Sequence, residues 1–111
     1  MNAIPYSEKR RHARMICWLP VAIAKGRRSS RGVAVNISRC GAYVRTKATW
    51  PHGVALTFTI RAGQERTISL TGQIVHMHEG RGMGVVFLED QALALMELGN
   101  FLKELSKEGQ T

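Results

Sequence analysis

Two arginines four positions apart, Arg10 and Arg14, provide the first chemically informative feature of the sequence. Each guanidinium donates two parallel hydrogen bonds to a phosphate and also stacks on a planar ring. Such a pair can contact opposite sides of one compact ligand.

The second feature is Asn-Ile-Ser-Arg-Cys-Gly at residues 36–41, which ends a run of alternating apolar residues. Asn36 and Ser38 are two positions apart. On a continuing strand their side chains would leave the same face and address one planar ligand. Gly41 permits either a turn with φ > 0 or a close approach of two backbones. The pattern indicates a strand that ends in a sharp turn.

In this order and spacing, Arg-x-x-x-Arg followed by Asn-x-Ser-x-x-Gly resembles the signature of PilZ domains, bacterial receptors for cyclic di-GMP. Residues 41–46 and 82–88 are similar to the family's strands after the motif and before its final helix. The resemblance covers residues 8–105. It implies a six-stranded β-barrel with a carboxy-terminal helix. No nucleophile, base and orienting acid occur in a recognisable arrangement, so neither enzymatic activity nor a metal or other cofactor is expected.

The resemblance also implies a ligand site. The arginines would contact the phosphates and guanine of cyclic di-GMP, the Asn and Ser would recognise the guanine edge, and the Gly would shape the turn. The expected binding residues are Arg10, Arg14, Asn36, Ser38 and Gly41.

Three further cations, Lys9, Arg11 and Arg39, are expected to add charge around this site. Lys9 stands where the family commonly has arginine, in a neighbourhood associated with binding one or two ligand molecules. The stoichiometry is therefore open, whereas the core of the motif is intact.

The charge is unevenly distributed along the chain. Of the net +8, residues 1–50 carry eleven Lys/Arg against Glu8, and residues 51–111 carry five against seven acids. The amino-terminal half is thus expected to attract anions. Residues 1–14 are interpreted as a flexible basic arm.

Length and cysteine content predict one globular domain in a reducing cytoplasm. The 111 residues suffice for a single core, and neither a signal peptide nor a membrane-spanning segment is apparent. Two buried free thiols are favoured over a disulfide between Cys17 and Cys40.

Period-two patterns predict strands over 15–25, 32–38, 42–46, 54–60, 66–78 and 83–88, and a closed antiparallel barrel removes their edges. Residues 26–32 are expected to form a basic turn. Pro20 suggests an edge or a bulge, and Gly72 suggests another bulge.

Residues 90–108 have helical periodicity, with Asp90 as the expected N-cap and Gly109 as the stop. The expected organisation is an arm (1–14), a barrel (15–89) and a helix (90–108). The apolar face of this helix consists of Leu95, Leu98, Phe101, Leu102 and Leu105, and the expected aromatic core consists of Trp18, Trp50, Phe58 and Phe87.

Other functional patterns are weaker. His76 and His78 share a strand face without a third metal ligand, so we interpret them as surface residues. The glycines at 80, 82 and 84 precede a strand, so they do not form a dinucleotide-binding loop.

The leading hypothesis is a cyclic di-GMP receptor that changes conformation and signals to an unidentified protein partner, in motility or biofilm control, as a monomer or weak dimer. One alternative is a basic barrel for single-stranded nucleic acid, which the 6% aromatic content disfavours. Another is a ligand-independent adaptor of the type IV pilus kind.

Overall fold

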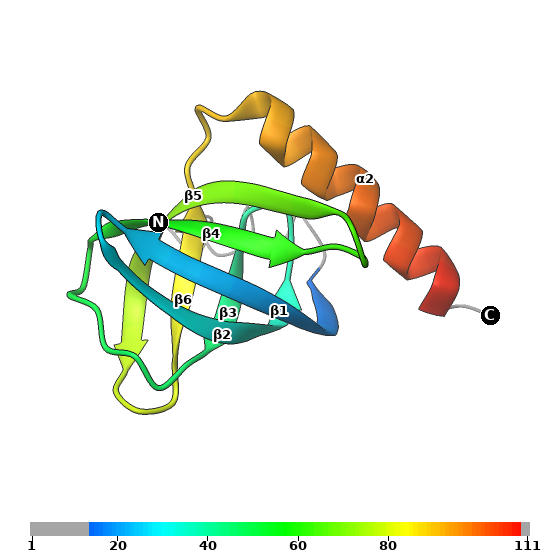
Figure 1. Cartoon of the computed structure of the whole chain (residues 1–111). Helices are drawn as coiled ribbons and strands as arrows, with labels where there is room; N and C mark the ends of the chain where they lie inside the picture. Colours follow the sequence, from blue (N-terminus) through cyan, green and yellow to red (C-terminus); the bar gives the residue numbers. More distant parts are fainter. Residues whose placement is uncertain (1–13, 110–111) are drawn as a thin grey trace, which may run out of the picture.

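Six strands that bury every second side chain close into a barrel. The computed structural model describes residues 14–109. All neighbouring strands are antiparallel, in the order β1-β2-β3-β6-β5-β4. Within residues 14–109 one helix, α2, follows β6 (Figure 1). The predicted six-stranded antiparallel barrel with a carboxy-terminal helix is confirmed. The elements are β1 (Met15–Lys25), β2 (Arg28–Ile37), β3 (Gly41–Arg45), β4 (Ala55–Arg61), β5 (Thr67–His78), β6 (Gly82–Phe87) and α2 (Ala92–Gly109).

Strand β4 shows how the pattern of the sequence produces the core. Leu56, Phe58 and Ile60 are buried, whereas Ala55 and Thr57 are exposed. The strand pairs with β1 on one side and β5 on the other, so its apolar face can only point into the barrel. The alternation predicted for this segment is confirmed.

Three of the four aromatic residues predicted for the core are buried, and one prediction was wrong. Trp50, Phe58 and Phe87 lie in the core as predicted, but Trp18 is 65% exposed. Leu19 packs against the core from β1, and neighbouring residues of a strand point to opposite faces. Trp18 must therefore point outward, and its assignment to the core was wrong.

The hairpin between β1 and β2 is tighter than predicted. Only Gly26 and Arg27 form the turn, and Gly26 has φ 60°. Arg28 to Arg31 already pair with β1, so the predicted turn over 26–32 was wrong from residue 28 onward. Arg28, Ser29 and Arg31 are exposed, whereas Ser30 is half-buried and its hydroxyl oxygen is buried. Pro20 follows a register shift between Ile16 and Leu19, which agrees with the expected bulge.

The bulge of β5 lies three residues beyond its expected position. Gly72 keeps the inward alternation and is buried, whereas the register shifts between Ile74 and His76. A Cβ at Gly72 would meet the side chains of Val85 and Phe58. The glycine therefore makes room for the core and does not mark the bulge.

Helix α2 packs on the barrel through the predicted apolar face. Leu98, Phe101 and Leu102 are buried in the core, and Leu95 and Leu105 are partly buried. The helix lies beside β5 and the β4–β5 turn (Figure 1). No helix within residues 14–109 is long and apolar enough to cross a membrane.

The start of α2 differs from the prediction. The helix begins at Ala92, so the residue before it is Gln91 and not Asp90. The Gln91 side chain accepts a hydrogen bond from the Thr71 backbone N–H (2.8 Å) and donates one to the Thr71 carbonyl (2.6 Å). These bonds join the beginning of the helix to β5.

Candidate functional site

The turn between β2 and β3, Ser38–Cys40, is held by its own hydrogen bonds. The Ser38 N–H donates to the Gly41 carbonyl (2.8 Å), and the Cys40 N–H donates to Ser38 Oγ (3.0 Å). Ser38 is only 3% exposed. Because β2 ends at Ile37, Asn36 lies in the strand and Ser38 lies beyond it, so the two do not share one continuous strand face.

Asn36 has an unsatisfied acceptor. Its Oδ1 is buried and accepts no hydrogen bond from any residue that the structure describes. A buried acceptor without a partner costs about 1–3 kcal/mol. The residue pairs with Ile16 of β1 and Tyr43 of β3. The oxygen is therefore a buried acceptor whose partner is not among residues 14–109.

Gly41 brings two backbones close together. A Cβ at this position would overlap the carbonyl oxygen of Val85 on β6. Positive φ angles occur at Gly26, Gly53 and Gly80 but not at Gly41. Of the two roles considered for this glycine, close approach is the one that the fold requires.

Arg14 lies next to this turn. It directly precedes Met15, which pairs with Ile37, and Ser38 directly follows Ile37. The antiparallel register therefore brings Arg14, which is exposed, beside Ser38. Arg10 and the second-rank cations Lys9 and Arg11 lie outside the described residues.

Arg39 projects from the turn toward α2. A Cβ at Gly99 would lie 3.1 Å from Arg39 Nε and 3.2 Å from Arg39 Cδ. The glycine in the middle of the helix therefore allows the arginine to rest on it. The sequence contained this signal, an otherwise unfavourable helical glycine, but not the identity of the partner.

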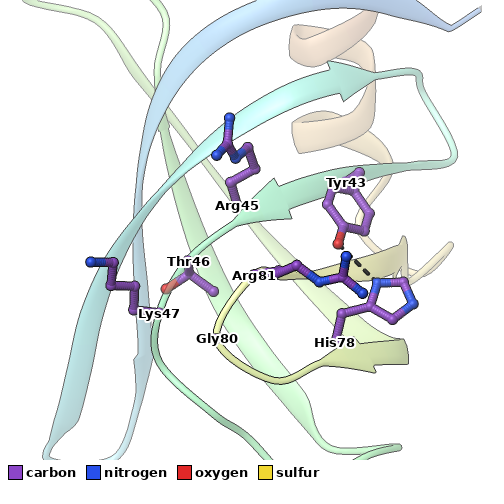
Figure 2. A pocket seen from close by; sticks show the side chains of 7 residues that line it. All are labelled: Tyr43, Arg45, Thr46, Lys47, His78, Gly80 and Arg81. Carbon is purple, nitrogen blue, oxygen red and sulfur yellow. Dashed lines mark hydrogen bonds between the residues drawn. The ribbon is translucent and has the colours of Figure 1, made fainter.

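A pocket that the sequence analysis missed lies at the other end of β3. It has a volume of about 660 Å³ and contains no acidic side chain in its lining (Figure 2). We call it the basic pocket; it is lined by Tyr43, Arg45, Thr46, Lys47, His78, Gly80 and Arg81. The alternation of Tyr43 and Arg45 was the available signal, since both leave the outer face of β3.

The histidines and cysteines form no metal site among the described residues. His76 and His78 stack with ring centroids 6.4 Å apart, and no group of three metal-ligating side chains occurs within residues 14–109. Cys17 and Cys40 are free thiols, as predicted. The Cys17 thiol donates to the Ala34 carbonyl (3.2 Å), and burial raises its pKa.

The comparisons with known proteins concern nearly the whole chain. A family model described as the PilZ domain matches residues 8–104. No curated protein matches the chain. Solved structures share the fold, with TM-scores of 0.63–0.76 for the three described next.

The PilZ domain of YcgR from Escherichia coli, solved with c-di-GMP, has a TM-score of 0.76 at 13% identity, covering 92% of this chain and 95% of that one. The Bacillus subtilis inhibitor of motility MotI/DgrA has a TM-score of 0.71 at 23% sequence identity. The match covers 89% of this chain and 52% of that one. The PilZ domain of CeSA from a cellulose-synthesizing bacterium has a TM-score of 0.63 at 22% sequence identity. The match covers 81% of this chain and 97% of that one. This chain thus spans about half the length of MotI/DgrA.

Proposed function

This chain belongs to the PilZ domain family, and on that premise we propose that it is a cyclic di-GMP receptor without enzymatic activity that signals to a protein partner. The observation that carries the proposal is the unpaired, buried Oδ1 of Asn36 on the strand beside Arg14. The fold similarity to a PilZ domain solved with c-di-GMP supports it.

The ligand's chemistry fits these residues. A guanine edge presents N–H groups, and the carboxamide oxygen of Asn36 can accept a hydrogen bond from one of them. Arg14, with Arg10, supplies bidentate donors for phosphate oxygens and a plane for a purine face. Ser38 already accepts a hydrogen bond from Cys40, so its hydroxyl proton is left for a ligand or for the turn.

The signalling step rests on the surface around the turn. The Arg39 side chain lies on α2 at Gly99, so an anion that attracts its guanidinium would change this contact. We expect a protein partner to detect the changed surface. Control of motility is the output we favour, because MotI/DgrA is a motility inhibitor.

Calorimetric titration with cyclic di-GMP tests the proposal, with GTP and linear pGpG as competitors for specificity. Arg14→Ala should weaken binding by about tenfold or more, since a charge-assisted hydrogen bond contributes about 1.5–3 kcal/mol and about 1.4 kcal/mol is a factor of ten. Asn36→Ala, which removes a neutral hydrogen bond of about 0.5–1.5 kcal/mol, should weaken binding by about two- to tenfold. The matched control is Arg31→Ala, which removes another exposed arginine, from the other half of β2.

The control should keep its affinity within about twofold. Absence of binding by the native protein would refute the receptor function. Unchanged affinity in both site variants would refute only the residue assignments. The titration also gives the stoichiometry, which the lysine at position 9 leaves open.

A further inference from the structure

The antiparallel strands collect basic residues at the barrel end away from the β2–β3 turn. In Figure 1 the β1–β2 hairpin lies at the upper left of the barrel and the β5–β6 turn at the lower left. The end of β3 pairs with the start of β6, and Thr46 just after β3 bonds to the carbonyls of both Arg31 and Arg81. We call this the basic end. It carries one acid, Glu79, against seven cations: Lys25, Arg27, Arg28, Arg31, Arg45, Lys47 and Arg81.

The basic pocket lies within this end, and its cations are unpaired. Arg45, Lys47 and Arg81 are exposed, and their side chains form no hydrogen bond or ion pair with any residue in 14–109. The Arg66–Glu104 contact is the only ion pair in that part of the chain. Figure 2 shows the Arg81 side chain extending toward Tyr43 and His78. Three positive charges therefore surround a hollow that no carboxylate neutralises.

A tyrosine–histidine pair adds a hydrogen-bond donor to the pocket. Tyr43 Oη and His78 Nδ1 are 2.9 Å apart. If the hydroxyl donates, the neutral ring carries its proton on Nε2; if the ring donates, the hydroxyl proton is free. In both tautomers one donor remains for a further acceptor.

The absence of a side chain at Gly82 of β6 makes room for the contact between Tyr43 and His78. A Cβ at Gly82 would lie 2.8 Å from the Tyr43 ring and 2.9 Å from its hydroxyl. Only glycine lets the tyrosine cross β6 to reach His78. The backbone turn at Gly80, with φ 77°, places Arg81 beside the same hollow. Two of the glycines at 80, 82 and 84 thus serve the pocket.

We propose that the basic pocket is a phosphate-binding site, separate from the site at the β2–β3 turn. A phosphate mono- or diester presents oxygens in several directions. The Arg81 guanidinium and the Tyr43–His78 pair can contact it from one side of the pocket (Figure 2), and the exposed Arg45 and Lys47 side chains line the rest. Gly41 and Arg45 stand at opposite ends of β3, about 13 Å apart at about 3.3 Å per residue. The phosphate belongs either to a small soluble ester or to a phospholipid headgroup.

The test begins with ¹⁵N-labelled protein titrated with pyrophosphate at low salt. We expect saturable shifts at Tyr43, Gly80 and Arg81, and the triple variant Arg45→Gln, Lys47→Gln, Arg81→Gln should weaken this binding by about tenfold or more. The control variant Arg61→Gln, Lys103→Gln, Lys107→Gln removes the same charge from exposed positions elsewhere. It should stay within about twofold.

Vesicles distinguish the two sources of phosphate. Cosedimentation with phosphatidylglycerol but not phosphatidylcholine vesicles, lost in the pocket variant and kept in the control variant, assigns a lipid headgroup. Pyrophosphate binding without vesicle binding assigns a soluble ester.

Three results would overturn the proposal: no binding of either probe, equal losses in both triple variants, or displacement of pyrophosphate by cyclic di-GMP. The pocket variant should bind cyclic di-GMP with native affinity, so a failure here is distinguishable from a failure of the receptor function. Thermal unfolding of both variants confirms that they are folded.

Discussion

Replacing Gly41 by alanine tests whether the start of β3, just after the β2–β3 turn, lies as close to the β6 backbone as the structure shows. The added Cβ would overlap the Val85 carbonyl oxygen. Neither backbone can move independently, because Gly41 pairs with Val86 and the Phe87 N–H donates to the Cys40 carbonyl (2.8 Å). The start of β3 must therefore separate from β6.

The cost has two parts. Overpacking of a close contact costs about 1–3 kcal/mol, and each lost backbone hydrogen bond costs about 1 kcal/mol. We expect Gly41→Ala to lower the free energy of unfolding by about 2–4 kcal/mol and the melting temperature by about 10 °C or more. Urea unfolding followed by circular dichroism measures the first value, and a thermal scan measures the second.

Gly63→Ala is the matched control. Its Cβ would meet only Arg66 Cβ, at an ordinary 3.8 Å, and its φ is not positive. The control should therefore be neutral or more stable by up to about 1 kcal/mol, through a less flexible unfolded chain. If Gly41→Ala were as stable as this control, the close approach of β3 and β6 would be refuted.

Gly99→Ala should stabilise the protein by about 0.5 kcal/mol, because alanine favours helix by about 1 kcal/mol and the exposed Arg39 side chain can move aside; a measured loss in urea unfolding would show that Arg39 is fixed. Cys17, whose pKa burial raises, should react with iodoacetamide more slowly in the folded than in the urea-unfolded chain at one pH, and equal rates by mass spectrometry would contradict this. Since the folded thiol keeps its proton to higher pH, its contribution to stability is present below the unfolded pKa and is lost as pH rises through the folded pKa. Arg66→Ala should cost only about 0.5 kcal/mol, because its ion pair with Glu104 is largely exposed; a loss above about 1.5 kcal/mol would indicate a stronger contact.

The strands and the helix could be predicted because each is half buried, and a half-buried element shows its period in its own sequence. Leu56, Phe58 and Ile60 alternate whatever their partners are, and Leu98 and Phe101 mark a helix face. These signals are local. The family motif is local too, since it consists of residue types at fixed spacing.

Features that depend on partners could not be predicted. Arg28 to Arg31 resemble a turn until β1 is there to pair with them. Gly72 resembles a bulge until Val85 and Phe58 are seen to occupy the space of its missing side chain. The contact of Arg39 with Gly99 joins two segments sixty residues apart, so neither residue predicts the other.

The uneven charge of the chain was read correctly from the sequence, but the basic residues of the amino-terminal half lie in two places and not at one site. The amino-terminal half is strongly basic, but the chain runs from Arg14, just before β1 and beside the β2–β3 turn, to Lys25 at the basic end, a path of about 35 Å at about 3.3 Å per residue. At physiological ionic strength charges are screened over about 8 Å, so the cations of the basic end, about 13 Å or more from the β2–β3 turn along the strands, act only weakly on an anion there. Cations at the basic end therefore add little to the attraction of an anion at Asn36 and Arg14. The exposed Arg45, Lys47 and Arg81 side chains, which add little to the first site, are consistent with a second one.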